Sequence, residues 1–248
     1  MKEPARSLFW LRFRSVLFYV VSGLCALPFL LFLPVLVLPV RYTFAVTDTY
    51  LRLQLFLLRG ICGIEYQVFG KEHLPKGSCL IASQHESSWE TLFFQVVLDR
   101  PVMFAKKEVF GYPIIGLTSR KLGHIPVDRQ GSVDAVRQGF EAGRDAVAQG
   151  RKLLIFPTGT RRQSGEAKVT IHSGVGVLYQ LAGVSVVPVL VNSGESWPSS
   201  TLVKYPGKIS VRILPQIPAG LDRREFLERI ENQLNQDAWP TPTPAEKT

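Results

Sequence analysis

The chain has 248 residues, 46% of them hydrophobic, and a formal net charge of +9 at pH 7, which suits one α/β domain with an appendage. The basic charge favours an anionic membrane surface or phosphate-bearing ligands, and the absence of a base-stacking motif and of zinc-finger spacing argues against nucleic acid as a partner. Three cysteines without a C-x-x-C pair indicate structural thiols in a reducing compartment.

The N-terminal region contains a long apolar run. No charged residue occurs between Val16 and Val40, and basic residues precede this run at Lys2, Arg6, Arg12 and Arg14. Roughly 25 apolar residues are enough to span a bilayer and too many for a cleaved signal peptide. However, Pro28, Pro34 and Pro39 each remove a helix hydrogen bond. Two arrangements therefore remain open: a kinked single span, or a helix that enters one leaflet and turns back.

The next segment, Tyr42 to Ile61, is amphipathic and carries Arg52 and Arg59. This composition predicts a returning arm or a helix that lies on the membrane surface. Basic residues occur on both sides of the apolar run, so the positive-inside rule does not decide the topology. We expect residues 1–62 to form a membrane-anchoring helical segment.

From about Ile64 onward, apolar strand patterns alternate with amphipathic helix patterns. Strands are expected at 79–83, 102–106, 122–128, 152–157, 184–192 and 208–217, and helices at 87–98, 133–150, 174–183 and 224–236. This order predicts an α/β domain over 63–238, with a mixed, partly parallel sheet flanked by helices. The Pro/Thr-rich tail, 239–248, is expected to be disordered. No dinucleotide-binding glycine motif and no Walker A sequence occurs, so no nucleotide cofactor is expected.

The stretch "IASQHESSWETLFF", residues 81–94, supports two interpretations. Ser87 and Glu90 fit a capping box at the start of the helix that follows. Alternatively, the preceding loop folds His85 back over the first turn, so that Glu90 orients the imidazole and leaves its other nitrogen as a base. The stretch by itself leaves both interpretations open.

Four motifs together are more specific. "HESSWE" at 85–90 resembles the H-x4-D/E motif of the glycerolipid acyltransferase family, which includes the 1-acylglycerol-3-phosphate acyltransferases. "GHIPVDR" at 123–129, "FPTGTR" at 156–161 and "VVPVLVNSG" at 186–194 resemble the second, third and fourth motifs of that family. The motifs occur in the family's order, and the resemblance extends from about Arg52 to Asn192.

This resemblance implies an activity and a location. A membrane-bound enzyme of this kind moves a fatty acyl group from acyl-CoA or acyl carrier protein to the free hydroxyl of a lysophospholipid, here lysophosphatidate giving phosphatidate. His85 and Glu90 would be the catalytic pair, with His85 removing the hydroxyl proton. The sequence contains no G-x-S-x-G elbow, the motif that would suggest a covalent acyl-enzyme intermediate. The resemblance implies that the reaction needs no cofactor and no metal. It also implies that the active site faces the cytoplasm.

The third motif supplies the main candidates for substrate binding. Arg161 follows a buried strand and a glycine, where a guanidinium can grip the lysolipid phosphate in a bidentate manner. Gly159 allows close approach of the backbone, and Thr160 lies between these two residues.

Two further cations are weaker candidates for binding the anion. Arg129 ends the second motif, and its alternative role is an ion pair with Asp128. Lys106 ends the expected strand at 102–106, and its alternative role is that of a solvated lysine beside Lys107.

The sequence departs from the family at three positions. Glu90 replaces the commoner aspartate and retains the carboxylate. Thr158 stands where the family usually has glutamate, and His172 precedes Gly174 where relatives often have lysine. The last two changes fall on the acceptor side of the site. They leave two alternatives open: the same chemistry on another lysolipid, such as an amino-acid-containing one, or a non-catalytic lipid-binding membrane protein.

Overall fold

The computed structural model describes residues 8–128, 132–162 and 170–236. Its centre is a seven-stranded sheet in the order β1-β7-β6-β2-β5-β3-β4. The strands are β1 (Ile64–Phe69), β2 (Leu80–Ser83), β3 (Val102–Lys106), β4 (Ile125–Val127), β5 (Leu153–Ile155), β6 (Val186–Val191) and β7 (Gly207–Ile213). The expected strands are therefore present, most of them shorter than their apolar patterns.

Five neighbouring strands of the sheet, β6, β2, β5, β3 and β4, run parallel to one another. Strand β7 pairs with β6 in the antiparallel sense, and β1 runs parallel to β7. Strand β2 lies in the interior of the sheet, where Leu80 aligns with Leu153 on one side and with Val186 on the other. All four β2 residues are buried, which explains why this strand is a continuous apolar run. The predicted mixed, partly parallel sheet is confirmed.

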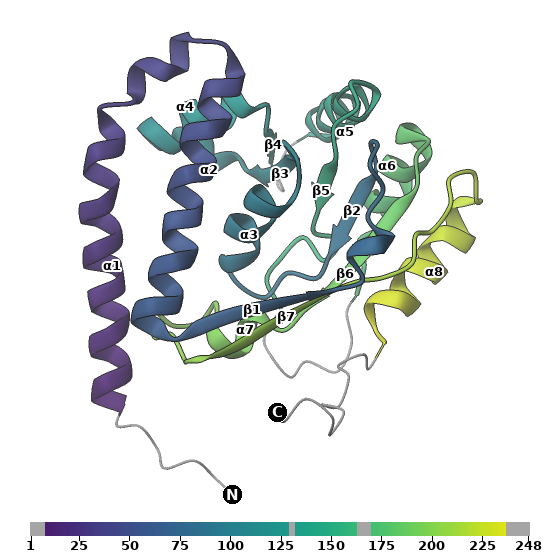
Figure 1. The fold of residues 1–248 in the computed structure, drawn as a ribbon. Coiled ribbons are helices and arrows are strands. Elements are labelled where there is room, and N and C mark those ends of the chain that lie inside the picture. Colours follow the sequence, from purple (N-terminus) through teal and green to yellow (C-terminus); the bar gives the residue numbers. More distant parts are fainter. Residues whose placement is uncertain (1–7, 129–131, 163–169, 237–248) are drawn as a thin grey trace, which may run out of the picture.

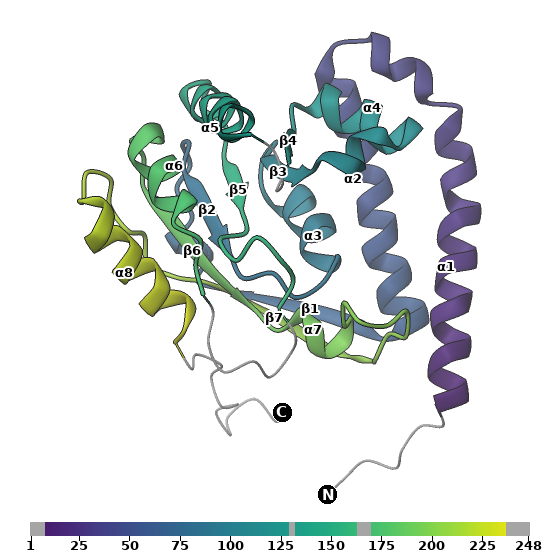
Figure 2. The ribbon, with the colours of Figure 1, turned by 180° about the vertical axis from the view of Figure 1, so that it is seen from behind.

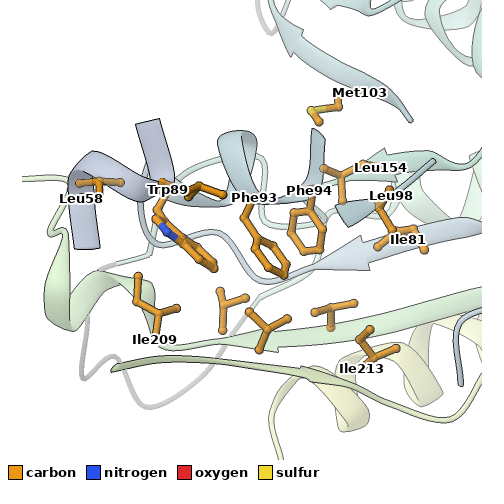
Figure 3. Packing of buried hydrophobic residues seen from close by; sticks show 14 of the residues in the cluster. Leu58, Ile81, Trp89, Phe93, Phe94, Leu98, Met103, Leu154, Ile209 and Ile213 are labelled. Carbon is orange, nitrogen blue, oxygen red and sulfur yellow. The ribbon is translucent and has the colours of Figure 1, made fainter. Parts of the chain in front are cut away.

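Helices cover both faces of the sheet (Figures 1 and 2). They are α3 (Trp89–Val97), α4 (Pro113–Leu122), α5 (Val133–Ala148), α6 (Gly174–Ala182), α7 (Ser193–Ser196) and α8 (Arg223–Leu234), with short 3-10 turns η3 (Lys71–His73) and η4 (Lys107–Gly111). On one face, Trp89, Phe93 and Phe94 of α3 pack against β-strand residues (Figure 3). On the other face, a second apolar cluster joins α5, α6 and α8 to the sheet. Helix α4 was not among the predicted elements.

The N-terminal run folds as a helical hairpin. It consists of α1 (Leu8–Leu30), the 3-10 turn η1 (Leu33–Val37), α2 (Val40–Leu57) and the π-turn η2 (Leu58–Cys62), and the two long helices lie side by side (Figure 1). Pro34 lies in η1, and Pro39 is the N-cap of α2, so these two prolines mark the turn. The segment after the turn is thus a returning arm. Helix α1 alone, among the described helices, is long and apolar enough to cross a membrane by length and composition.

The hairpin is docked onto the domain. Helix α2 packs against α1 and α3, and its Leu55 belongs to the core cluster under α3. From α1, Phe18 and Tyr19 form a cage with Trp197 around the ammonium of Lys204, which lies 5.0, 3.7 and 4.2 Å from the respective ring centroids. Burial lowers the pKa of Lys204 to about 8. The inner face of α1 is therefore fixed to the protein.

The outer face of the hairpin is apolar and exposed. Its exposed large side chains include Phe9, Trp10, Phe13, Val16, Leu17, Val20, Leu24, Leu27 and Leu30 in α1, followed by Leu31, Phe32, Leu33, Val37 and Leu38 at the turn. A continuous apolar surface of this extent is typical of a site that contacts lipid or protein.

Candidate active site

The parallel part of the sheet brings the four sequence motifs to one edge. Parallel strands end at the same side of a sheet, and ligands of open α/β sheets bind outside these carboxyl ends. His85 follows the end of β2 by two residues, Phe156 follows β5 directly, and Ser193 follows β6 by two residues. Lys106 is the last residue of β3. The topology of the sheet, and not proximity in the chain, assembles the site.

His85 and Glu90 face each other across the start of α3. Nδ1 of His85 lies 3.4 Å from Oε2 of Glu90, and the two side chains are 11% and 0% exposed. This buried nitrogen has no hydrogen bond within the described part of the chain. The imidazole stacks on the ring of Phe156, with centroids 4.0 Å apart and planes 17° apart. Because Nδ1 faces the carboxylate, Nε2 lies on the other side of the ring, away from this contact.

Hydrogen bonds hold the Glu90 carboxylate in place. It accepts the backbone N–H groups of Glu86 and Ser87, both at 3.1 Å, and the hydroxyl of Ser193. The hydroxyl of Ser87 in turn accepts the N–H of Trp89 at 2.8 Å. The N-cap of α3 is Ser88 and not the predicted Ser87, and Ser88 makes no side-chain capping bond. The bond from the Ser87 N–H to Glu90 is the half of the expected capping box that is present, and it occurs together with the contact to His85. A carboxylate can accept about four hydrogen bonds, so the two interpretations of this stretch do not exclude each other.

A buried ion pair joins the first motif to the third. Nη2 of Arg162 lies 3.4 Å from Oε1 of Glu86, and the backbone N–H of Arg162 donates to the carbonyl of His85 at 2.7 Å. Oε2 of Glu86 accepts the N–H of Gly194 at 3.0 Å. Burial raises the pKa of Glu86 to about 7, although the Gly194 N–H and Arg162 act in the opposite direction. Arg162 therefore fixes the loop after β5 against the loop that carries His85.

The loop after β5 makes a tight turn at Gly159. This residue has a φ of +63°, and its N–H donates to the carbonyl of Phe156 at 2.9 Å. A Cβ at this position would lie 3.0 Å from Cδ2 of His172 and 3.2 Å from its Nε2. Both the backbone conformation and the contact with His172 therefore require glycine. The Thr158 hydroxyl donates to the carbonyl of Thr160 at 2.7 Å, so this threonine stabilises the loop itself.

The predicted anion ligands differ in their surroundings. Arg161 is exposed and makes no hydrogen bond or ion pair within residues 8–128, 132–162 and 170–236. It is adjacent in sequence to Arg162, whose backbone N–H contacts the carbonyl of His85, and it stays a predicted ligand of the headgroup phosphate. Lys106 is exposed at the sheet edge, whereas its neighbour Lys107 pairs with Asp128 at 3.2 Å.

Two of the predictions concern residues that the structure does not describe. Arg129 is outside the described residues, as is the tail expected to be disordered. Thr160 is exposed on the loop with Arg161. Within the described ranges, no three His, Cys, Asp or Glu side chains come close enough to hold a metal ion. The structure thus brings His85, Glu90 and the loop at 156–162 together, and it leaves Lys106 at the rim.

Sequence reasoning missed several residues that support the catalytic pair. Ser193 and Gly194 lie more than one hundred positions from the acidic residues they contact, at separations of 103 and 108. Glu86 and Arg162 are adjacent to predicted site residues, and this adjacency was the available signal. Phe156 begins the third motif, but its stacking on His85 depends on how β2 and β5 align in the sheet.

Comparisons with known proteins agree with this geometry. The model of the Acyltransferase family matches residues 65–192. A 1-acyl-sn-glycerol-3-phosphate acyltransferase of Pseudomonas aeruginosa is 33% identical over 238 residues, which cover 94% of this chain and 91% of that protein. The human 1-acyl-sn-glycerol-3-phosphate acyltransferase alpha is 30% identical over 195 residues, covering 76% of this chain and 69% of the human protein.

The crystal structure of the 1-acyl-sn-glycerophosphate acyltransferase PlsC from Thermotoga maritima has the same fold. It superimposes with a TM-score of 0.73 at 18% sequence identity, over 90% of this chain and 92% of that one. The match of the family model and the identity to the relatives extend the resemblance seen in the four motifs to nearly the whole chain. This chain belongs to the acyltransferase family and is an acyltransferase related to the 1-acyl-sn-glycerol-3-phosphate acyltransferases.

Proposed function

We propose that the protein transfers a fatty acyl group from an acyl thioester, acyl-CoA or acyl carrier protein, to the free hydroxyl of lysophosphatidate, giving phosphatidate. The observation that carries the chemistry is the contact of a buried carboxylate with one imidazole nitrogen at the carboxyl edge of the sheet. The choice of acceptor is supported by the relatives, which are named as 1-acyl-sn-glycerol-3-phosphate acyltransferases.

The catalytic pair acts by general base catalysis. Glu90 holds His85 in the tautomer that carries its proton on Nδ1, so that Nε2 takes the proton from the acceptor hydroxyl. The hydroxyl oxygen attacks the thioester carbonyl carbon, a C–O bond forms and the C–S bond breaks. The proton then passes from His85 to the departing thiolate. No covalent acyl-enzyme is needed.

The loop at 156–162 holds the acceptor headgroup. The guanidinium of Arg161 is exposed and has no partner within the described residues, so it is free to take the phosphate. Gly159 keeps the turn compact, and Thr160 exposes a hydroxyl beside Arg161. Lys106 at the end of β3 adds positive charge at this edge of the sheet. Arg129, which lies outside the described residues, is a further candidate for binding the anion.

The hairpin attaches the enzyme to the membrane. Residues 1–62 form the anchoring segment, and residues 63–238 form the catalytic domain. The apolar outer face of α1 contacts acyl chains, and the net positive charge favours an anionic membrane surface. The active site faces the cytoplasm, where acyl thioesters are available.

A second acceptor is supported by the third motif. Thr158 carries no charge and bonds within its own loop, and His172 packs against Gly159 on the same loop. Both residues occupy positions where relatives carry charged groups. A lysolipid with a different headgroup, such as an amino-acid-containing one, is therefore the second candidate.

One experiment tests both candidates. Purified protein is given labelled acyl-CoA or acyl carrier protein together with lysophosphatidate and two other lysolipids, in wild type and in Thr158→Glu. Phosphatidate should be the main product in wild type, and the ratio of kcat/KM values among acceptors should change little in the variant. A wild-type preference for another lysolipid, moved toward lysophosphatidate by Thr158→Glu, would replace the first candidate with the second.

A further inference from the structure

In helix α4, small residues are buried against the protein and several large apolar residues are exposed, which is the reverse of the usual arrangement. Gly116, Ser119 and Leu122 are buried, and a Cβ at Gly116 would lie 2.3 Å from the carbonyl oxygen of Phe110. The large apolar side chains of Ile115 and Leu117 are instead 56% and 54% exposed. A surface helix of a soluble domain normally directs such residues to the core. The outer face of α4 is therefore built to be covered.

Two further residues extend this face. Tyr112, directly before α4, is 58% exposed, and Ile114 is also exposed. We call Tyr112, Ile114, Ile115 and Leu117 the α4 face. Four large exposed side chains within six consecutive positions exceed the scattered apolar residues found on most monomer surfaces.

The α4 face is continuous with the apolar tip of the hairpin. Helix α4 packs against α2 and against η1, and Figures 1 and 2 both show it beside the turn that joins α1 to α2. At that turn Leu31 and Val37 are almost fully exposed, at 81% and 86%. Two segments separated by about eighty positions thus form one apolar surface, and α1 belongs to it as the candidate anchor.

Charged groups border this surface in the manner of a membrane-binding helix. Arg41 is exposed at the start of α2, close to the tip, and stacks on Tyr42 at 4.9 Å. Lys106 and Lys107 are exposed just before α4, with Glu108 beside them as an exposed acidic residue, and Lys121 lies in the last turn of α4. Apolar residues flanked by cations, with a tyrosine at the boundary, are typical of helices in the interface of anionic bilayers.

We propose that the α4 face inserts into the interface of an anionic phospholipid bilayer and is a second membrane contact of the catalytic domain, besides the hairpin. The proposal rests on the membrane attachment given under Proposed function. Two contacts hold the orientation of the domain at the bilayer more firmly than the docked hairpin does alone. Tyr112 follows the end of β3 by six residues, so this attachment holds the sheet edge that carries the site close to the lipid. A lysolipid then reaches His85 without leaving the membrane surface.

The test places an environment-sensitive fluorophore on the α4 face. Ile115→Cys is labelled in a Cys25→Ser background, since Cys25 is only half-buried whereas Cys62 and Cys79 are buried. Leu202→Cys is the matched control, because Leu202 is a strongly exposed leucine outside the helices. Both proteins are reconstituted in phosphatidylcholine vesicles with about 30% phosphatidylglycerol and lipid-borne quenchers.

The label at position 115 should shift to shorter emission wavelength and lose at least half of its intensity to the quenchers, and the label at 202 should change by less than a tenth. Equal, weak quenching at both positions would overturn the proposal. A shift at 115 that grows with protein concentration but not with quencher would instead assign the face to a second copy of the chain, and would also overturn it. This readout needs no catalysis, so its failure is distinct from a failure of the proposed reaction.

An activity measurement gives a second, independent test. Ile115→Ser combined with Leu117→Ser should lower kcat/KM for vesicle-borne lysophosphatidate about 5-fold or more and leave kcat/KM for a short-chain, water-soluble lysolipid unchanged. Leu202→Ser should change neither value. Equal losses on both substrates would show that the double variant damages the fold and not the membrane contact, and would contradict the proposal.

Discussion

A single carboxylate does two tasks at the start of α3. Glu90 accepts the N–H groups of Glu86 and Ser87 just before the helix, and it faces Nδ1 of His85. The same contacts that stabilise this part of the fold therefore hold the proposed catalytic pair. Residues that bind the carboxylate from other elements should therefore affect the reaction without touching substrate.

Ser193 is such a positioning residue. Its hydroxyl donates to Glu90, and removing a hydrogen bond to a charged group in Ser193→Ala should lower kcat about 10-fold, equivalent to about 1.4 kcal/mol, with KM for both substrates unchanged. Ser196→Ala is the matched control, since Ser196 is a buried serine on the same short helix. Steady-state kinetics of the two variants test whether Ser193 acts through Glu90. Equal losses of kcat in both variants would mean that α7 acts only through packing.

Arg161 should affect the acceptor and not the donor. Because its side chain is exposed, its contact with the headgroup is partly screened, and Arg161→Ala should raise KM for the lysolipid about 10-fold while KM for the acyl donor stays within 2-fold. Arg137→Ala, on the exposed side of α5, serves as the control. If KM for the lysolipid does not move, the assignment of Arg161 to the headgroup is wrong.

Glu86 should make stability depend on pH. Burial raises the pKa of this carboxyl from its ordinary value of 4.5 to about 7, so between these values the folded state holds a proton that the unfolded state has lost. The stabilisation is fully present below about pH 4.5 and disappears as pH rises through about 7. The free energy of unfolding of wild type minus that of Glu86→Gln should thus fall by roughly 1–3 kcal/mol between pH 5 and pH 8.

Thermal or denaturant unfolding of both proteins at several pH values measures this difference. Glutamine has no proton to lose, so it removes the titration and keeps the size of the side chain. A difference that stays constant from pH 5 to pH 8 would show that Arg162 and the Gly194 N–H keep Glu86 ionised throughout the range.

At the scale of elements, the docking of the hairpin rests on a small set of contacts. Lys204 lies within an aromatic cage of which Phe18 and Tyr19 belong to α1. Lys204→Ala removes the cation–π contacts and leaves a cavity, and it should weaken the docking of α1 by roughly 1–3 kcal/mol. Hydrogen exchange in α1 should accelerate about 5-fold or more, whereas Lys208→Ala, at an exposed position on β7, should leave it unchanged. Unaltered exchange in Lys204→Ala would show that apolar contacts alone hold α1.

The elements show which parts of the fold are readable from the sequence. Strands such as β2 and β6 are continuous apolar runs because both faces of the sheet are covered, and helices such as α5 and α8 have a clear apolar stripe. Helix α4 was missed because Leu122 is the one large apolar residue among its buried positions, beside Gly116 and Ser119, whereas Ile114, Ile115 and Leu117 are exposed. A helix is predicted from sequence by the large apolar residues of its buried face. This prediction fails for a helix whose large apolar residues are mostly exposed.

The hairpin was only partly predictable for a similar reason. The apolar run and its prolines indicated a bend, but they did not indicate that the chain reverses and packs back onto the domain. The structure shows that Pro34 and Pro39 mark a reversal, after which α2 packs against α3. This packing depends on Leu55 and Leu58 joining the core cluster, which no local pattern reveals.

At the scale of the molecule, the sheet order determines the site. The motifs at 85–90 and 156–161 follow the adjacent parallel strands β2 and β5, and the motif at 186–194 consists of β6 and the residues after it, so the three loops meet at one edge. The order of motifs indicated the family and the residues of the catalytic pair. It did not indicate that Ser193, Gly194 and Arg162 would hold that pair, because these contacts depend on strand neighbours that lie far apart in sequence.

The central claim is that His85 and Glu90 act together as an oriented base for acyl transfer to a hydroxyl. The most direct measurement is kcat with acyl-CoA and lysophosphatidate in wild type, His85→Ala, Glu90→Gln and Ser87→Ala. His85→Ala should abolish transfer, and Glu90→Gln should lower kcat about 10²–10⁴-fold because the imidazole loses its orienting charge. Ser87→Ala should cost about 1 kcal/mol of stability, because the N–H of Trp89 at the start of α3 loses its hydrogen bond, and should leave kcat within a few-fold of wild type. Full activity in Glu90→Gln, with stability reduced as in Ser87→Ala, would show that Glu90 only caps the helix and would contradict the account.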